Sequence, residues 1–147
     1  MMGSSIENSI LSMDTETTKI MKDIRVRIDE MYSKFTDDNK KIPELPKFED
    51  IKGKFSINYS ISKELTDLID YLLNIKLRVK VALSGIDDMI HIKITSKTDY
   101  VLINNFKNNL KRYKEELTGY LFDISDLVKN ANNKLKVLQA YNWVSVE

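Results

Sequence analysis

The sequence predicts an all-α fold, an elongated bundle of three long helices. Over three segments, apolar residues recur at alternating spacings of three and four, which places them on one stripe of a helix. Only 4 glycines and 2 prolines punctuate the 147 residues, so long uninterrupted elements are expected. The chain has no cysteine, and its fold must therefore depend on packing rather than on disulfides. We expect a single domain spanning residues 1–147.

The first helix is predicted over about residues 5–35. Its stripe keeps the three-and-four spacing as far as Ile24 and then drifts to positions spaced less regularly. The members of this stripe are Ile6, Ile10, Met13, Thr17, Ile20, Ile24, Ile28, Met31 and Phe35.

A long irregular connection is predicted over residues 36–61. Both prolines and Gly53 fall there, so helices are expected to end. Four apolar residues spaced by threes indicate either one short helix or an extended strap across the bundle: Ile42, Leu45, Phe48 and Ile51. Phe55, Ile57 and Tyr59 alternate with polar residues, which is typical of a short strand if a partner exists. The direction of the first helix stays open across so long a connection.

The second helix is predicted over residues 62–94. Its stripe follows regular alternating steps and consists of Leu65, Leu68, Leu72, Ile75, Val79, Ala82, Ile86 and Met89. Four further residues widen it, as in a bundle rather than a two-stranded coiled coil: Ile69, Leu73, Leu83 and Ile90.

The third helix, over residues 97–141, is the most regular, because one polar residue, Lys134, interrupts twelve stripe positions. They are Ile103, Phe106, Leu110, Tyr113, Leu117, Tyr120, Ile124, Leu127, Ala131, Lys134, Leu138 and Tyr141. Ser96 and Asp99 stand in the relation of a helix capping signal. So short a join predicts antiparallel neighbours.

Gly85 leaves an alternative open at this join. Inside a helix a glycine costs up to about 1 kcal/mol relative to alanine, and here the missing side chain would admit the ring of Phe106. If Gly85 instead ends the helix as a left-handed cap, a small β-hairpin would form around residues 89–104.

Catalytic and metal sites find little support. Asp87, Asp88 and His91 have helical spacing for a shared metal, but His91 is the only histidine, and catalytic zinc usually takes three protein ligands. Neither a nucleophile elbow nor a glycine-rich phosphate loop can be built from the isolated glycines. We therefore expect no enzyme, no catalytic or metal-binding residue and no cofactor.

Nucleic-acid binding is not expected either. Lys107, Lys111 and Lys114 share one helix face, but the whole chain carries a net charge of only +1. Such a face is more often simply solvated.

The remaining expectation is a non-enzymatic protein that acts through helical protein–protein interaction, as an adaptor, a chaperone-like protein or an assembly subunit. The expected partner is another helical protein or a second copy of this chain, and in the second case the two copies would form a homo-oligomer. The candidate contacts are apolar and aromatic residues near the helix ends: Met89, Ile90, Ile92, Ile94, Tyr141 and Trp143.

The alternative is a secreted or injected helical effector, or a membrane-active protein, that binds a receptor or a bilayer through an apolar tip. The N-terminal residues lack the pattern of a signal peptide, and no window reaches the roughly 18 apolar residues of a transmembrane helix. As written, the sequence predicts a cytoplasmic protein, although secretion by a non-classical route stays open.

Overall fold

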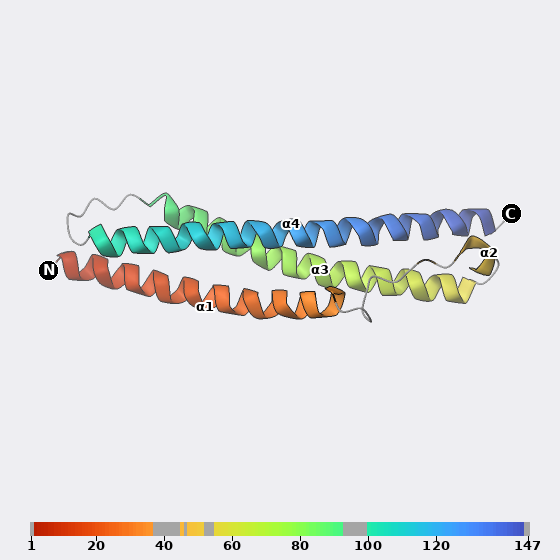
Figure 1. Ribbon diagram of the computed structural model, residues 1–147, viewed down its shortest axis with the longest axis horizontal. Coiled ribbons are helices and arrows are strands. Elements are labelled where there is room, and N and C mark those ends of the chain that lie inside the picture. The colour runs from red at the N-terminus through yellow and green to blue at the C-terminus, as the bar shows by residue number, and fades with distance from the viewer. Residues whose placement is uncertain (1, 37–44, 46, 52–54, 93–99, 146–147) are drawn as a thin grey trace. The chain divides into compact units, whose positions relative to one another are not determined.

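The computed structural model describes residues 2–36, 45, 47–51, 55–92 and 100–145. Four helices follow in chain order: α1 (Met2–Thr36), α2 (Phe48–Ile51), α3 (Phe55–Ile90) and α4 (Tyr100–Ser145), as Figure 1 shows. The predicted all-α bundle of three long helices is confirmed, and no strand occurs among the described residues.

The chain forms two compact units, and each takes a part of the same three long helices. Unit 1 contains Met1–Ile28 and Leu77–Leu121, and unit 2 contains Asp29–Lys76 and Phe122–Glu147. Each unit has its own buried apolar residues.

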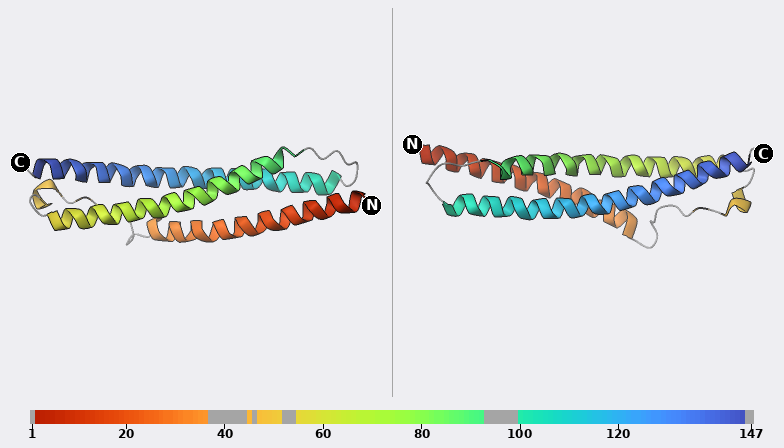
Figure 2. Two further views of the ribbon diagram at one scale, coloured as in Figure 1. Left: turned by 180° about the vertical axis from the view of Figure 1, so that it is seen from behind. Right: turned by 90° about the horizontal axis from the view of Figure 1, so that it is seen from above.

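In unit 1, α1 and α4 run in the same direction and α3 runs in the opposite one, as both views of Figure 2 show. Its fully buried side chains come from all three helices and include Ile10, Met21, Ile28, Val79, Ile86, Leu110 and Leu117. Thr17 is the one buried polar residue among those described, and its hydroxyl donates a hydrogen bond to the Met13 carbonyl oxygen at 2.7 Å. This bond satisfies the hydroxyl, which the apolar surroundings would otherwise penalise.

Unit 2 buries Met31 of α1 together with residues of α3 and α4, among them Leu65, Leu72, Ile124, Ala131 and Leu138. Aromatic residues join its helices at the edge of this core. The ring of Phe35 lies 6.4 Å from that of Tyr71 at a tilt of 55°, and Lys34 Nζ lies 4.6 Å from the centre of the Tyr71 ring. The Tyr32 hydroxyl donates a hydrogen bond to the Asp123 carboxylate.

The stripe predicted for α4 is confirmed at every position. Five of its residues are partly buried: Tyr113, Tyr120, Leu127, Lys134 and Tyr141. The others are buried, and six of them recur every seven residues: Ile103, Leu110, Leu117, Ile124, Ala131 and Leu138. A seven-residue repeat is the spacing that keeps one helix face against its neighbours. The helix continues beyond the predicted end to Ser145.

One position of the α1 stripe was predicted wrongly. Ile20 is 47% exposed, and the neighbouring Met21 is fully buried in its place. With Met21, the spacing from Thr17 to Phe35 alternates between four and three without the predicted drift. The regularly spaced buried residues of α1 therefore include Met21 in place of Ile20. The flexible side chain of methionine fills core space well. The side chain of Ile6 lies outside the described residues.

The start of α3 also corrects the prediction. Phe55, Ile57 and Tyr59, predicted as a short strand, lie in its first turns. Three alternating residues are too few to distinguish a strand from a helix. Leu73, predicted to widen the stripe, is exposed. The connection between the first two long helices is thus shorter than the predicted residues 36–61, because α3 begins at Phe55. It contains the single turn of α2, and Ile42 lies outside the described residues.

The hairpin alternative is not shown. Met89 and Ile90 are helical, as are residues 100–104, while residues 93–99, with Ser96 and Asp99, lie outside the described part. Gly85 lies inside α3, as the helix predicted over residues 62–94 requires, and the alternative of a glycine cap at this position is wrong. Nothing lies within 4 Å of a Cβ built on Gly85, so the prediction that its missing side chain admits Phe106 is wrong too.

Candidate interaction surface

Asp87, Asp88 and His91, the three residues considered above as possible metal ligands, have the following surroundings. The Asp87 carboxylate lies 2.7 Å from Lys114 Nζ, and His91 Nδ1 lies 2.7 Å from the Asp87 backbone carbonyl oxygen, to which it donates. Asp88 is exposed one helix position away. Among the described residues, no group of three potential metal ligands comes together.

Of the six residues predicted as contacts, the structure describes the side chains of four: Met89, Ile90, Ile92 and Tyr141. Met89 and Ile90 are partly buried, and the Met89 sulfur lies 3.7 Å from the Thr17 hydroxyl, inside unit 1. Ile92 follows the end of α3 and is 42% exposed. It is the only one of the six with an exposed described side chain, because Tyr141 is partly buried. Ile94 and the side chain of Trp143 lie outside the described residues.

A different surface stands out in unit 1, along the side of α3 that faces away from the core. Leu77 and Val81 are 61% and 65% exposed. At about 100° per residue, Ser84, Gly85 and Asp88 share their side of the helix, and all three are exposed. Val79 and Ile86, on the opposite side, are buried. We call Leu77, Val81, Ser84, Gly85 and Asp88 the outer α3 face.

Ile20 of α1, 47% exposed, lies along the chain between two residues that contact α3. Two contacts fix the alignment of α1 with α3: Asp23 pairs with Arg78 at 3.8 Å, and Thr17 touches Met89. Ile20 lies between the α1 partners, and Val81 and Gly85 lie between the α3 partners. Gly85 has no side chain, and a Cβ there would meet nothing within 4 Å, so the surface is open at this position.

Charged residues border the outer α3 face. Asp23 accepts a second contact from Arg27 at 3.3 Å, so this carboxylate bridges two arginines on the α1 side. Lys80 and Asp88 are also exposed. Within the described part of the chain, neither Lys80 nor Asp88 takes part in an ion pair.

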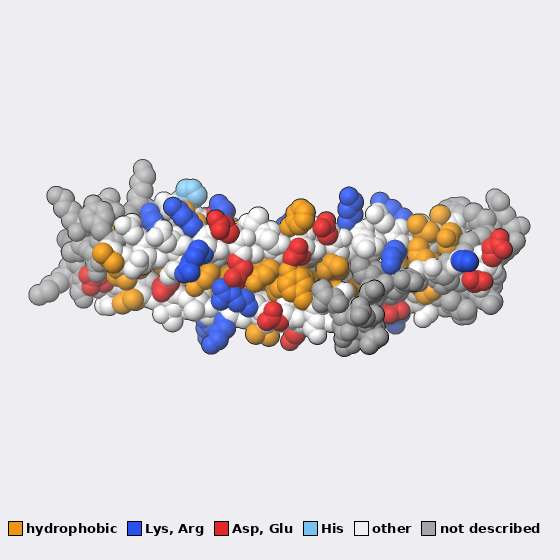
Figure 3. Space-filling view, in the orientation of Figure 1, with side chains coloured by type: hydrophobic (Ala, Val, Ile, Leu, Met, Phe, Trp, Pro, Cys, Tyr) orange, Lys and Arg blue, Asp and Glu red, His pale blue; other side chains and the backbone are white. Residues whose placement is uncertain are grey.

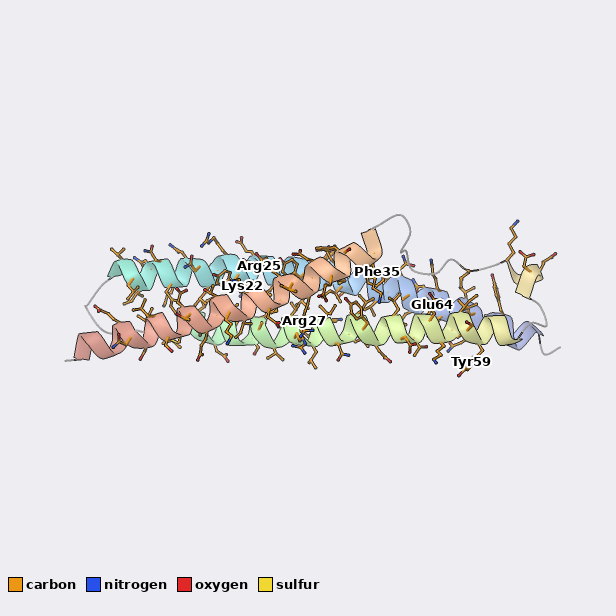
Figure 4. All side chains as sticks on the ribbon, turned by 90° about the horizontal axis from the view of Figure 1, so that it is seen from below. Lys22, Arg25, Arg27, Phe35, Tyr59 and Glu64 are labelled. Atoms are coloured by element: carbon orange, nitrogen blue, oxygen red, sulfur yellow. The ribbon has the colours of Figure 1, made fainter. Side chains whose placement is uncertain are left out.

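The interface between α1 and α4, by contrast, is closed by a polar cluster. Arg25 donates two hydrogen bonds to Glu116, each 2.9 Å long, and its guanidinium lies 5.7 Å from the centre of the Tyr113 ring. Glu116 raises the pKa of Arg25, whereas burial raises the pKa of Tyr120, with Glu116 adding to that rise. Figure 4 shows Arg25 on the side of α1 toward α4 and Arg27 on the side toward α3.

A hollow of about 440 Å³ lies on α4, lined by Lys111, Lys114, Glu115 and Thr118. Two lysines favour an anion, but Glu115 opposes one and Lys114 is already paired with Asp87. The Thr118 hydroxyl donates to the Lys114 carbonyl oxygen at 2.7 Å, so it too is engaged. This basic face is therefore a weaker candidate than the outer α3 face.

Sequence reasoning missed Leu77 and Val81 because they alternate with Arg78 and Lys80 in a run that looked basic. Their departure from the α3 stripe was the available signal. Figure 3 shows that other hydrophobic side chains also reach the surface among charged ones, so only the combination of exposure with a shared helix side marks a candidate.

Comparisons with protein-family models, with curated proteins and with solved structures find no match to this chain. No stretch of the described helices combines the length and the apolar character that a membrane-spanning helix needs.

Proposed function

We propose that this protein is a non-enzymatic interaction protein that binds a helix of its partner along the outer α3 face. The observation that carries the proposal is the pair Leu77 and Val81, which lie one turn apart on one side of α3 and are both more than half exposed. Large apolar side chains arranged in this way are the anchors by which helices dock on other helices.

The open surface at Gly85 supports the same function. Glycine allows the backbone of a partner to approach closely, and the exposed side chain of Val81 lies about one turn before it on the same helix. The charged residues Asp23, Lys80 and Asp88 would form the polar rim that surrounds most interfaces.

The test is affinity capture from extracts of the source cells, with Val81→Lys and Val101→Lys compared with the wild type. A lysine in the middle of the surface desolvates poorly, so Val81→Lys should reduce capture of the partner by about tenfold or more. Val101 is the matched control, since it is 69% exposed against 65% for Val81 but lies in the first turn of α4.

The expected result is that Val101→Lys captures the partner as the wild type does. Equal yields of every captured protein for Val81→Lys and the wild type would refute the proposal. Circular dichroism of both variants should match the wild type, because both positions are exposed.

A second candidate is a membrane-active or receptor-binding protein that uses an apolar end. Ile92, just after α3, and Val101, at the start of α4, are both exposed and favour this function. Vesicles of zwitterionic lipid are the probe, because anionic lipid would itself attract an added lysine. Here Val101→Lys should reduce cosedimentation and Val81→Lys should not, the reverse of the first test. Absence of wild-type cosedimentation at every lipid composition would refute the membrane version.

A further inference from the structure

We infer that the partner of the outer α3 face is a second copy of this chain, paired with the first in antiparallel about Ser84. This inference rests on the proposed function and names the occupant of the same surface. Three features of α3 carry it: the order of its charges, the small residues at its centre and the position of its apolar residues.

The charges along this part of α3 are separated by sign. Lys76, Arg78 and Lys80 precede Ser84, and Asp87 and Asp88 follow it. A parallel pair of such helices would set like charges against each other, which is unfavourable. An antiparallel pair sets the basic half of each copy against the acidic half of the other.

The register follows from Lys80 and Asp88, the two exposed charges of this set that no ion pair in the described part of the chain holds. Arg78 and Asp87 are held by Asp23 and Lys114 of their own unit. Lys80 and Asp88 lie four residues before and four residues after Ser84. Antiparallel pairing centred on Ser84 therefore brings Lys80 of each copy to Asp88 of the other, and the two-fold symmetry makes this contact twice.

Ser84 and Gly85 then lie where the two helices cross. Their small size lets the backbones approach, and the space around Gly85 is open. Val81, three residues before the centre, would lie within one turn of this small pair in the other copy. Leu77, seven residues before the centre, would meet the segment containing Ile92, which is exposed eight residues after it.

The contact is short. From Leu77 to Ile92 it spans roughly 22 Å, at about 1.5 Å per residue. A contact of this length buries less surface area than a standard protein–protein interface. We therefore expect a dissociation constant on the order of micromolar rather than nanomolar. The dimer should therefore appear at high protein concentration and separate on dilution.

Reciprocal charge reversal tests the pairing, measured by sedimentation equilibrium of the full chain over a concentration series. Lys80→Glu alone and Asp88→Lys alone should each weaken self-association by about tenfold or more, because each creates two like-charge contacts. An equimolar mixture of the two variants should associate as the wild type does, since both of its contacts then join opposite charges. The double variant carrying both changes should also recover.

Lys129→Glu and Asp126→Lys are the matched controls, because they reverse the same charges at exposed positions of α4 in unit 2. Both should associate as the wild type does. The inference would be overturned if the wild type stays monomeric at about millimolar concentration, because a dissociation constant above that value is weaker than those of most specific complexes. A mixture no stronger than the single variants would overturn the antiparallel register.

Failure of this inference and failure of the proposed function give different results. If the wild type is monomeric but loses a captured partner on Val81→Lys, the surface binds another protein and only the second-copy assignment is wrong. If Val81→Lys changes neither self-association nor capture, both are wrong.

Discussion

The helices of unit 1 are joined at the edges of their core by ion pairs, whereas those of unit 2 are joined by aromatic rings and a tyrosine hydroxyl. The contacts in unit 1 are Arg25 with Glu116, Arg78 with Asp23 and Lys114 with Asp87. The contacts in unit 2 are Phe35 with Tyr71, Lys34 with Tyr71 and Tyr32 with Asp123. Both units bury the same kinds of aliphatic residue.

Helices with the same pattern of buried aliphatic residues can therefore be joined at the edges of their core either by ion pairs or by aromatic contacts. Exposed ion pairs contribute about 0–1 kcal/mol each and are screened by salt. Contacts between aromatic rings contribute about as much but depend on packing and not on ionic strength. The ion pairs of unit 1 should therefore respond to salt, and the ring contact of Phe35 with Tyr71 in unit 2 should not.

The largest expected effect tests whether the two cores are indeed equivalent. Leu117→Ala in unit 1 and Leu138→Ala in unit 2 each remove a fully buried side chain. Each should lower the free energy of unfolding by about 2–5 kcal/mol, since a cavity remains where the side chain was. Urea denaturation measures both, and a loss below about 1 kcal/mol for either one would show that the cores differ as well as the edges.

The next effect concerns unit 2. Tyr32→Phe removes the hydroxyl that donates to Asp123. The expected loss of unfolding free energy is about 1.5 kcal/mol, as for other hydrogen bonds to charged groups. Tyr59→Phe is the control, because Tyr59 is exposed and should change by less than about 0.5 kcal/mol. Equal losses for the two variants would show that the Tyr32 contact contributes nothing.

Two glycines inside the helices of unit 1 offer positions where a substitution can stabilise that unit. Gly85 lies in α3 and Gly119 in α4, and a Cβ added at either position would meet nothing within 4 Å. Gly85→Ala and Gly119→Ala should each raise the free energy of unfolding by about 0.5–1 kcal/mol. Thermal unfolding measures the gain, and destabilisation by either change would contradict the open space around these residues.

A smaller effect concerns the ion pairs of unit 1. Glu116→Gln replaces the carboxylate that accepts both hydrogen bonds from Arg25. At low ionic strength we expect a loss of about 0.5 kcal/mol, which should disappear near about 1 M salt because the pair is partly exposed. Unfolding at two salt concentrations measures it. The same loss at both would assign the effect to packing rather than to charge.

The smallest effect is a pH dependence, again in unit 1. Burial raises the pKa of Tyr120, and Glu116 adds to the rise. Because the pKa is higher in the folded chain, stability is unaffected below about pH 10 and falls as the pH rises from there through the folded pKa. Tyr120→Phe should therefore lose less stability between about pH 9 and 11 than the wild type. Parallel losses for the two proteins would remove Tyr120 as the cause.

The buried parts of the fold were predictable from sequence because burial imposes a period. The α4 stripe was predicted in full, including Lys134, whose position on the stripe proved partly buried. Ile20 was predicted to be buried in the position that Met21 occupies, because the two are adjacent and both apolar. Only the spacing over the whole helix distinguishes them. Phe55, Ile57 and Tyr59 failed for a related reason, since three residues are too few to distinguish the two periods.

The candidate surface was not predictable in the same way. An outward helix face has no required spacing, so Leu77 and Val81 differ from buried residues only by lying off the stripe. Of the residues predicted as contacts, Ile92 alone has a described and exposed side chain. Met89 had appeared to be available at a helix end, but α1 covers it through Thr17, a contact between distant parts of the chain that helix periodicity does not encode.

The seven-residue recurrence of buried positions in α4, from Ile103 to Leu138, also restricts how the length of this protein can evolve. Gain or loss of one residue turns every later side chain by about 100° and carries the buried set out to solvent. Gain or loss of seven restores each face to its neighbours after two turns. Related chains should therefore differ in helix length by sevens, with α3 and α4 changing together, so that evolution lengthens or shortens such a protein in whole repeats.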